Sequence, residues 1–234
     1  LLRPDLNDII SGINQLDGLE DLSLTSNGSL LANKAQNLKD SGIRRITVSL
    51  DSLDSESFTK VSGGRGQLKD ALAGIDAALE AGLTPLKINC VIEKGMNEDQ
   101  ILPLTRYARD KGLILRFIEF MDVGNKNEWN MEKVVPSAEI QKIIASEFDI
   151  KPADPNFYGE VAGRYLFADG QGEVGFISSV TQAFCSSCTR ARISSDGKLY
   201  TCLFSGRGFD LKELLRDGCS DKVIAEKIRT IWEG

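Results

Sequence analysis

Residues 68–92 read LKDALAGIDAALEAGLTPLKINCVI, and two different periods in this stretch decide the fold. In the first part, apolar residues recur in steps of three and four at positions 68, 71, 72, 75, 78 and 79, and Gly82 follows as a stop signal. That spacing predicts a helix. In residues 86–92, apolar and polar side chains alternate, which predicts a strand. A helix that leads into a strand is part of a βαβ unit.

The same alternation of helix and strand extends in both directions along the chain. Further strands are predicted over residues 22–25, 46–50 and 115–120, and further helices over residues 5–16, 33–41 and 98–111. This order predicts an α/β fold with a parallel sheet, either open or curved into a barrel. Four strands cannot close an eight-stranded barrel of about 250 residues, so we expect at most a partial barrel.

The pattern changes after residue 121. A loop, DVGNKNEWN at residues 122–130, precedes a predicted helix over residues 137–146, for which Ser137 is the expected N-cap. Strands are then predicted at residues 164–168 and 173–179, with a hairpin at residues 191–194 and 198–203 and closing helices at residues 211–216 and 221–232. We therefore expect two regions, 1–121 and 122–234.

Composition excludes several classes of chemistry. The 234 residues contain 28 Lys+Arg and 34 Asp+Glu, a net charge of −6, and no histidine. Catalytic triads, HExxH sites and Cys/His zinc fingers all need an imidazole. The acidic balance argues against nucleic-acid and membrane partners, and no apolar run of about 18 residues is present. Five cysteines without a secreted-scaffold pattern indicate a reducing compartment, so we expect a cytoplasmic protein.

Polar residues gather near the ends of the predicted strands. Thr25, Ser49, and Lys87 with Asn89 are placed at or near such carboxyl ends, as is Glu119 with Met121. Lys87 and Asn89 also share one face of their strand. The carboxyl edge of a parallel sheet is where α/β proteins bind ligands. A lysine inside a strand is costly unless it is ion-paired, lies on an edge strand or faces a polar cavity, and spacing alone leaves these alternatives open.

The most specific pattern is CSSC followed by a third cysteine. Cys185, Cys188 and Cys202 are separated by a predicted hairpin that can bring the third thiol back to the first two. Three thiolates without histidine suit zinc or an iron–sulfur cluster. A redox CxxC, a four-cysteine zinc site that includes Cys219, and unrelated buried thiols such as Cys90 are the alternatives.

Two arginines lie between these cysteines. Alternation puts Arg190 and Arg192 on one face of the strand and Ala191 on the other. Two guanidinium groups beside thiolate ligands form an anion receptor matched to phosphate. The alternative is a solvated hairpin face.

Four stretches together resemble a known family: CSSCTRARISSDGKLYTCLF, RFIEFMDVGN, LTSNG and RRITVSLD. They are similar to the GTP 3′,8-cyclases (MoaA family) of molybdenum cofactor biosynthesis, which are radical S-adenosylmethionine (SAM) lyases. The resemblance covers essentially the whole chain, and its cysteine stretch is the most specific part.

The resemblance implies a partial (β/α)6 barrel with a C-terminal region that carries a [4Fe–4S] cluster. It implies that Cys185, Cys188 and Cys202 hold this cluster and leave one iron for substrate. It further implies that Thr25, Lys87, Arg190, Ala191 and Arg192 contact GTP, and that Ser49 and Met121 contact SAM. A second [4Fe–4S] cluster that cleaves SAM belongs to the family, as does transfer of the product to cyclic pyranopterin monophosphate synthase; a homodimer is compatible with it.

The chain departs from the family pattern in lacking the CxxxCxxC and GGEP-like motifs and a tail that ends in two glycines. We therefore expect a fragment of the enzyme that does not cleave SAM by itself. Two other hypotheses remain: a different radical SAM enzyme that modifies peptides with an auxiliary cluster, and a non-enzymatic α/β domain with structural zinc.

Overall fold

The computed structural model describes residues 1–123 and 128–233, which form two compact units. The sheet unit comprises residues 1–121 and 129–184, and the cysteine unit comprises residues 122–128 and 185–234. Residues 124–127 of the predicted 122–130 loop, and Gly234, lie outside the described residues.

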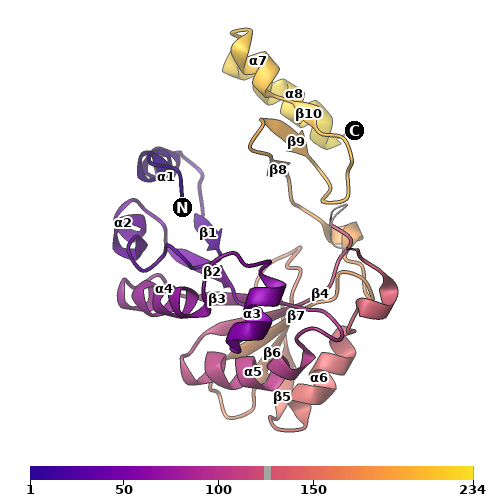
Figure 1. Cartoon of the computed structure of the whole chain (residues 1–234). Helices are drawn as coiled ribbons and strands as arrows, with labels where there is room; N and C mark the ends of the chain where they lie inside the picture. Colours follow the sequence, from indigo (N-terminus) through magenta and orange to yellow (C-terminus); the bar gives the residue numbers. More distant parts are fainter. Residues whose placement is uncertain (124–127, 234) are drawn as a thin grey trace. The chain divides into compact units, whose positions relative to one another are not determined.

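The sheet unit is built on one seven-stranded sheet with the order β1-β2-β3-β4-β7-β6-β5 (Figure 1). Strands β1 to β4 and β7 are parallel to their neighbours, and β6 and β5 continue the sheet in antiparallel fashion. The strand bounds are β1 Ser23–Ser26, β2 Arg45–Ser49, β3 Lys87–Ile92, β4 Ile114–Glu119, β5 Ile150–Ala153, β6 Gly163–Phe167 and β7 Glu173–Ile177.

Helices cover one face of this sheet and bury the core against it (Figure 1). In β3 and β4 every second residue is buried, for example Ile88 in β3 and Phe117 in β4. These side chains belong to the same core as buried helix residues such as Ile75 and Leu104. Alternation therefore leaves the opposite face with the polar residues. The helix bounds are α1 Leu6–Asn14, α2 Ala35–Asp40, α3 Ser55–Val61, α4 Leu68–Glu80, α5 Ile101–Asp110 and α6 Ser137–Ala145.

The four strands predicted in the first half are confirmed to within a residue, and so is the α/β class with a parallel sheet. The division of the chain differs from the predicted boundary after residue 121, because β7 pairs with β4 and carries β6 and β5 into the same sheet. The predicted N-cap at Ser137 is wrong. The cap position is Pro136, and Ser137 is the first helical residue.

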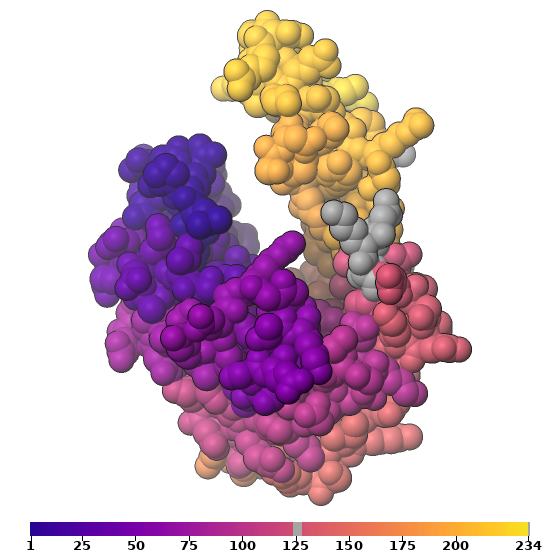
Figure 2. Space-filling model, in the orientation of Figure 1, coloured from indigo at the N-terminus to yellow at the C-terminus, as the bar shows by residue number. Residues whose placement is uncertain are grey.

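The cysteine unit contains a three-stranded sheet of order β10-β9-β8 and two helices. Leu199 and Leu211 are its only buried apolar residues among those described, and α8 buries none of its side chains. Figure 2 shows residues 185–233 of this unit in orange to yellow. The bounds are η3 Cys185–Ser187, β8 Arg192–Ile193, β9 Lys198–Tyr200, β10 Phe209–Asp210, α7 Lys212–Arg216 and α8 Asp221–Glu233. Among the described residues, no helix combines the length and the apolar character needed to span a bilayer.

Candidate functional site

The face of the sheet opposite the helices carries two rows of polar side chains. Register places Thr25, Thr47 and Lys87 side by side on β1, β2 and β3. One step further along the strands, Ser49, Asn89 and Arg116 are neighbours on β2, β3 and β4. Since residues in register share a face, these six side chains line one surface.

Arg116 links the two rows, and it is not among the residues predicted from the sequence. Its Nε donates a hydrogen bond to Asn89 Oδ1 at 2.9 Å, and its Nη2 lies 3.4 Å from Thr47 Oγ1. Gly175 on β7 leaves room for this side chain, because a Cβ there would lie 3.2 Å from Arg116 Cγ. The alternation in LRFIEF, residues 115–120, places Arg116 on the face opposite the core. A charged residue inside a predicted strand could therefore have indicated this position.

The electrostatics of this face are those of crowded cations. Burial and the nearby charges of Arg116 and Arg45 lower the pKa of Lys87. Burial and Arg45 likewise lower the pKa of Arg116. Among the described residues, Lys87 Nζ has neither a hydrogen bond nor an ion pair, and its strand lies inside the sheet rather than on an edge. An anion bound here would relieve this repulsion.

The expected strand-end positions are only partly as predicted. Ser49 ends β2, Thr25 is the third residue of β1, and Met121 lies two residues beyond β4. Lys87 instead begins β3, at the amino end of the strand, because the strand runs from Lys87 to Ile92. The structure thus brings Thr25 and Lys87 onto one row, with Ser49 one row along, and it leaves Met121 outside these rows.

A buried carboxylate marks the carboxyl end of β4. Glu119 has no exposed surface, and its two oxygens accept five hydrogen bonds. Ser137 donates through N and Oγ, Val180 through N, and Thr181 through N and Oγ1. Although burial opposes the charged form, these donors hold the pKa of Glu119 below its ordinary value.

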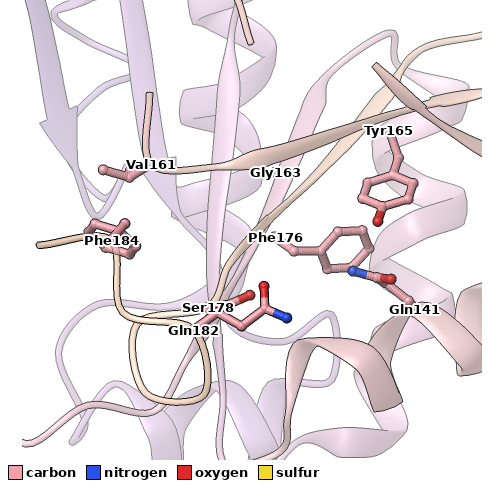
Figure 3. A pocket seen from close by; sticks show the side chains of 8 residues that line it. All are labelled: Gln141, Val161, Gly163, Tyr165, Phe176, Ser178, Gln182 and Phe184. Carbon is pink, nitrogen blue, oxygen red and sulfur yellow. The ribbon is translucent and has the colours of Figure 1, made fainter. Parts of the chain in front are cut away.

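A cavity of about 220 Å³ lies on the other face of the sheet (Figure 3). Its lining carries hydroxyl and amide groups among aromatic rings but no charged side chain. In Figure 3 the side chains of Tyr165, Phe176 and Gln141 lie close together. A cavity without a charged side chain is poorly suited to bind a phosphate. The face that carries Lys87 and Arg116 is therefore the better candidate for an anion site. The lining residues are Gln141, Val161, Gly163, Tyr165, Phe176, Ser178, Gln182 and Phe184.

The predicted metal ligands lie in the cysteine unit as free thiols. Cys185 begins η3 and is exposed, Cys188 is half-buried just beyond it, and Cys202 is exposed after β9. Within the described part of the chain, no group of three or more His, Cys, Asp or Glu side chains converges closely enough to hold a metal ion. The structure therefore does not bring the three thiols together.

The two arginines between the cysteines have different surroundings. Arg190 Nε and Nη2 lie 3.3 Å and 3.1 Å from Cys188 Sγ. Donation from the backbone and the guanidinium of Arg190 lowers the pKa of the Cys188 thiol. Arg192 lies in β8, and its Nη1 is buried without a hydrogen-bond partner among the described residues. A buried donor of this kind calls for an acceptor that a ligand can supply.

The donor set fits an iron–sulfur cluster by its chemistry. Thiolates are the ligands of such clusters, and Cys188 already lies in surroundings that favour the thiolate. None of the five cysteines is in a disulfide.

Comparison with known proteins decides the family. The family described as "Radical SAM superfamily" matches residues 1–108, and the one described as "Molybdenum Cofactor Synthesis C" matches residues 113–234. A protein of Xanthomonas campestris named GTP 3′,8-cyclase is 51% identical over 232 residues, which cover 99% of this chain and 68% of that protein. The chain belongs to the GTP 3′,8-cyclase family.

Other members of the GTP 3′,8-cyclase family are similar over the same span. The Staphylococcus carnosus protein of that name is 47% identical over 99% of this chain and 68% of its own length. A solved structure of coproporphyrinogen III oxidase from Escherichia coli, described as a radical SAM enzyme, has a TM-score of 0.44 at 12% identity and covers 68% of this chain and 43% of that one. The two family matches meet between residues 108 and 113.

Proposed function

We propose that this chain is the GTP-binding part of a radical SAM enzyme that cyclises GTP, with a partial barrel in the sheet unit and a [4Fe–4S] cluster on Cys185, Cys188 and Cys202. When bound, SAM and the clusters supply a carbon-centred radical that begins the formation of a bond between the ribose and C8 of guanine. The observation that supports this function best is the cationic polar face, in a chain that belongs to the family and is otherwise acidic.

On that face, Lys87 and Arg116 bind phosphate oxygens of GTP. Burial and the neighbouring cations lower the pKa of both groups although Glu160 and Glu173 act in the opposite direction, so a triphosphate would relieve the remaining repulsion. Arg116 presents a planar fork held in place by Asn89, which is suited to bidentate phosphate contacts. Thr25 adds a hydroxyl on the neighbouring row.

In the cysteine unit, Arg192 offers its unpartnered Nη1 to GTP, and Ala191 exposes backbone between the two arginines. Arg190 acts as a GTP contact and also favours the thiolate of Cys188. Ser49 and Met121 contact SAM. The product passes to the next enzyme of cofactor biosynthesis, and the protein acts in the cytoplasm.

GTP affinity of paired variants tests this function. Arg116→Ala should weaken GTP binding roughly tenfold or more, as expected when a charged hydrogen-bonding partner is removed. Arg106→Ala, which removes an exposed arginine paired with Glu147, is the matched control. Binding is measured by calorimetry on anaerobically prepared protein.

Metal analysis of the same preparation tests the cluster. We expect iron and sulfide, with absorbance near roughly 400 nm from thiolate-bound iron. Stoichiometric zinc without that absorbance, or normal GTP affinity in the Arg116 variant, contradicts the proposal.

A further inference from the structure

We propose that Glu119 is a positioning residue for SAM, because its buried carboxylate fixes the segment that carries Met121. The inference rests on the proposed function, since Met121 is a SAM contact only within that function. Glu119 itself is not proposed to contact any reacting atom.

The carboxylate joins three segments that are far apart in the sequence. It ends β4, it accepts from Ser137 at the start of α6, and it accepts from Val180 and Thr181 beyond β7. The donor–acceptor distances lie between 2.6 and 3.0 Å, and all of the donors are neutral N–H and O–H groups. No lysine or arginine among the described residues pairs with this carboxylate.

A buried carboxylate without a counter-ion contributes little to core stability. Its hydrogen bonds do, however, restrict the positions of the segments that supply the donors. Burying a carboxylate costs free energy unless several donors meet it, so the network is stable only when all three segments are in register. The N-terminal end of α6 adds favourable partial charge at the same point.

The segment after Glu119 has a second anchor close by. Trp129 Nε1 donates to the Phe120 carbonyl at 2.8 Å. The backbone is therefore held on both sides of Phe120, by the carboxylate before it and by the indole after it. Met121 follows directly, so its position depends on both anchors. Lys87 and Thr25, the proposed GTP contacts of the sheet unit, lie on other strands without a bond to Glu119.

Glu119→Gln tests this role, because the amide keeps the shape and places an N–H₂ group against donors. Oε1 accepts from three donors and Oε2 from two, so either orientation of the amide opposes at least two of them. In the full-length holoenzyme we expect the Kd for labelled SAM, measured by equilibrium dialysis, to rise roughly tenfold while the Kd for GTP changes by less than about twofold.

A pair of variants at Thr181 provides the conservative rescue. Thr181→Val loses the hydroxyl that donates to Oε1, and it should raise the Kd for SAM several-fold; Thr181→Ser keeps the hydroxyl and should bind SAM normally. Glu147→Gln, at an exposed carboxylate paired with Arg106, is the control for loss of charge. If Glu119→Gln does not fold, the comparison of Thr181→Val with Thr181→Ser is sufficient to test the inference.

Three outcomes overturn the inference: unchanged SAM affinity in folded Glu119→Gln, equal losses of SAM and GTP affinity, or equal behaviour of Thr181→Val and Thr181→Ser. A wild-type holoenzyme that binds SAM normally but does not bind GTP overturns the proposed function instead. The SAM measurements then still decide the role of Glu119.

Discussion

Lys87 occupies a position at which a charge is unfavourable for stability. It begins a central strand, lies beside Arg116 and Arg45, and has its pKa lowered by burial and by those neighbours. The sequence predicted its strand and its face, but Lys87 was grouped with residues near carboxyl ends of strands, whereas it is the first residue of β3. Nor did the sequence reveal Arg116 as its neighbour, since the two are brought together by strand register.

Lys87→Met should therefore separate binding from stability. Removing a half-buried charge among cations should raise the free energy of unfolding by about 0.5–1 kcal/mol. The same change should weaken GTP binding roughly tenfold. Urea unfolding and calorimetry measure the two effects. Lys69→Met, on the exposed surface of α4, should change neither; a destabilised Lys87→Met protein contradicts the argument.

Asp51, just beyond β2, gives a prediction about pH. Burial raises its pKa to about 6, although its Oδ1 accepts from Val91 N at 2.8 Å. Between about pH 4 and 6 the folded chain thus holds a proton that the unfolded chain has released, so stability falls as pH rises through that window.

Asp51→Asn cannot titrate and keeps an acceptor for Val91. Its advantage in free energy of unfolding over the wild type should be near zero at acid pH and grow to at most about 3 kcal/mol above pH 6. Urea titrations from pH 4 to 8 measure the difference. An advantage that shrinks as pH rises would contradict the raised pKa.

At the scale of elements, helix α4 packs closely at Gly74 against the turn after β1. A Cβ on Gly74 would lie 2.4 Å from the Gly28 carbonyl oxygen and 3.0 Å from Leu31 Cβ. The helical period predicted α4 correctly. It did not predict that position 74 requires glycine, because the atoms that leave no room for a side chain there belong to Gly28 and Leu31.

Gly74→Ala should consequently destabilise the chain by about 2–3 kcal/mol, because the helix must move away from the turn that follows Thr25. Gly12→Ala in α1 is the matched control, since a Cβ there meets nothing within 4 Å. Alanine is the better helix former, so that control should gain up to about 1 kcal/mol. Thermal unfolding compares the two; similar effects at both positions would contradict this reading of α4.

Elements of the second half were predicted less completely for a physical reason. The strands predicted at residues 164–168 and 173–179 are β6 and β7, and they pair with each other across the short turn between them. A turn signal reports only this local partner. The parallel pairing of β7 with β4 joins residues far apart in the sequence. Ser137 was predicted to cap its own helix, whereas its N and Oγ donate to Glu119, which no local pattern indicates.

At the scale of the whole molecule, the two units differ in how they are stabilised. The sheet unit has a continuous apolar core, while the cysteine unit buries only Leu199 and Leu211 among its described apolar residues. With so small a core, we expect the cysteine unit to gain much of its stability from the proposed cluster.

Removing iron with a chelator under anaerobic conditions should therefore affect the units unequally. Amides of β9 and α8 should lose protection from hydrogen exchange, while those of β3 and α5 should keep theirs. Exchange followed by mass spectrometry on the full-length holoenzyme and its apo form measures this. Equal protection in α8 with and without iron would show that the cysteine unit is stable without a cluster.

The pairing of β4 with β7 has a consequence for synthesis of the chain. The start of β7 at residue 173 follows the end of β4 at residue 119 by 173 − 119 = 54 residues. At about 5–20 residues per second, β4 waits several seconds on the ribosome as a bare edge strand. During that wait Glu119 lacks Val180 and Thr181 and stands as an open negative charge at the end of an apolar strand, which opposes pairing with other nascent chains. We therefore expect the carboxylate that joins three segments in the folded chain to oppose aggregation before β7 is made.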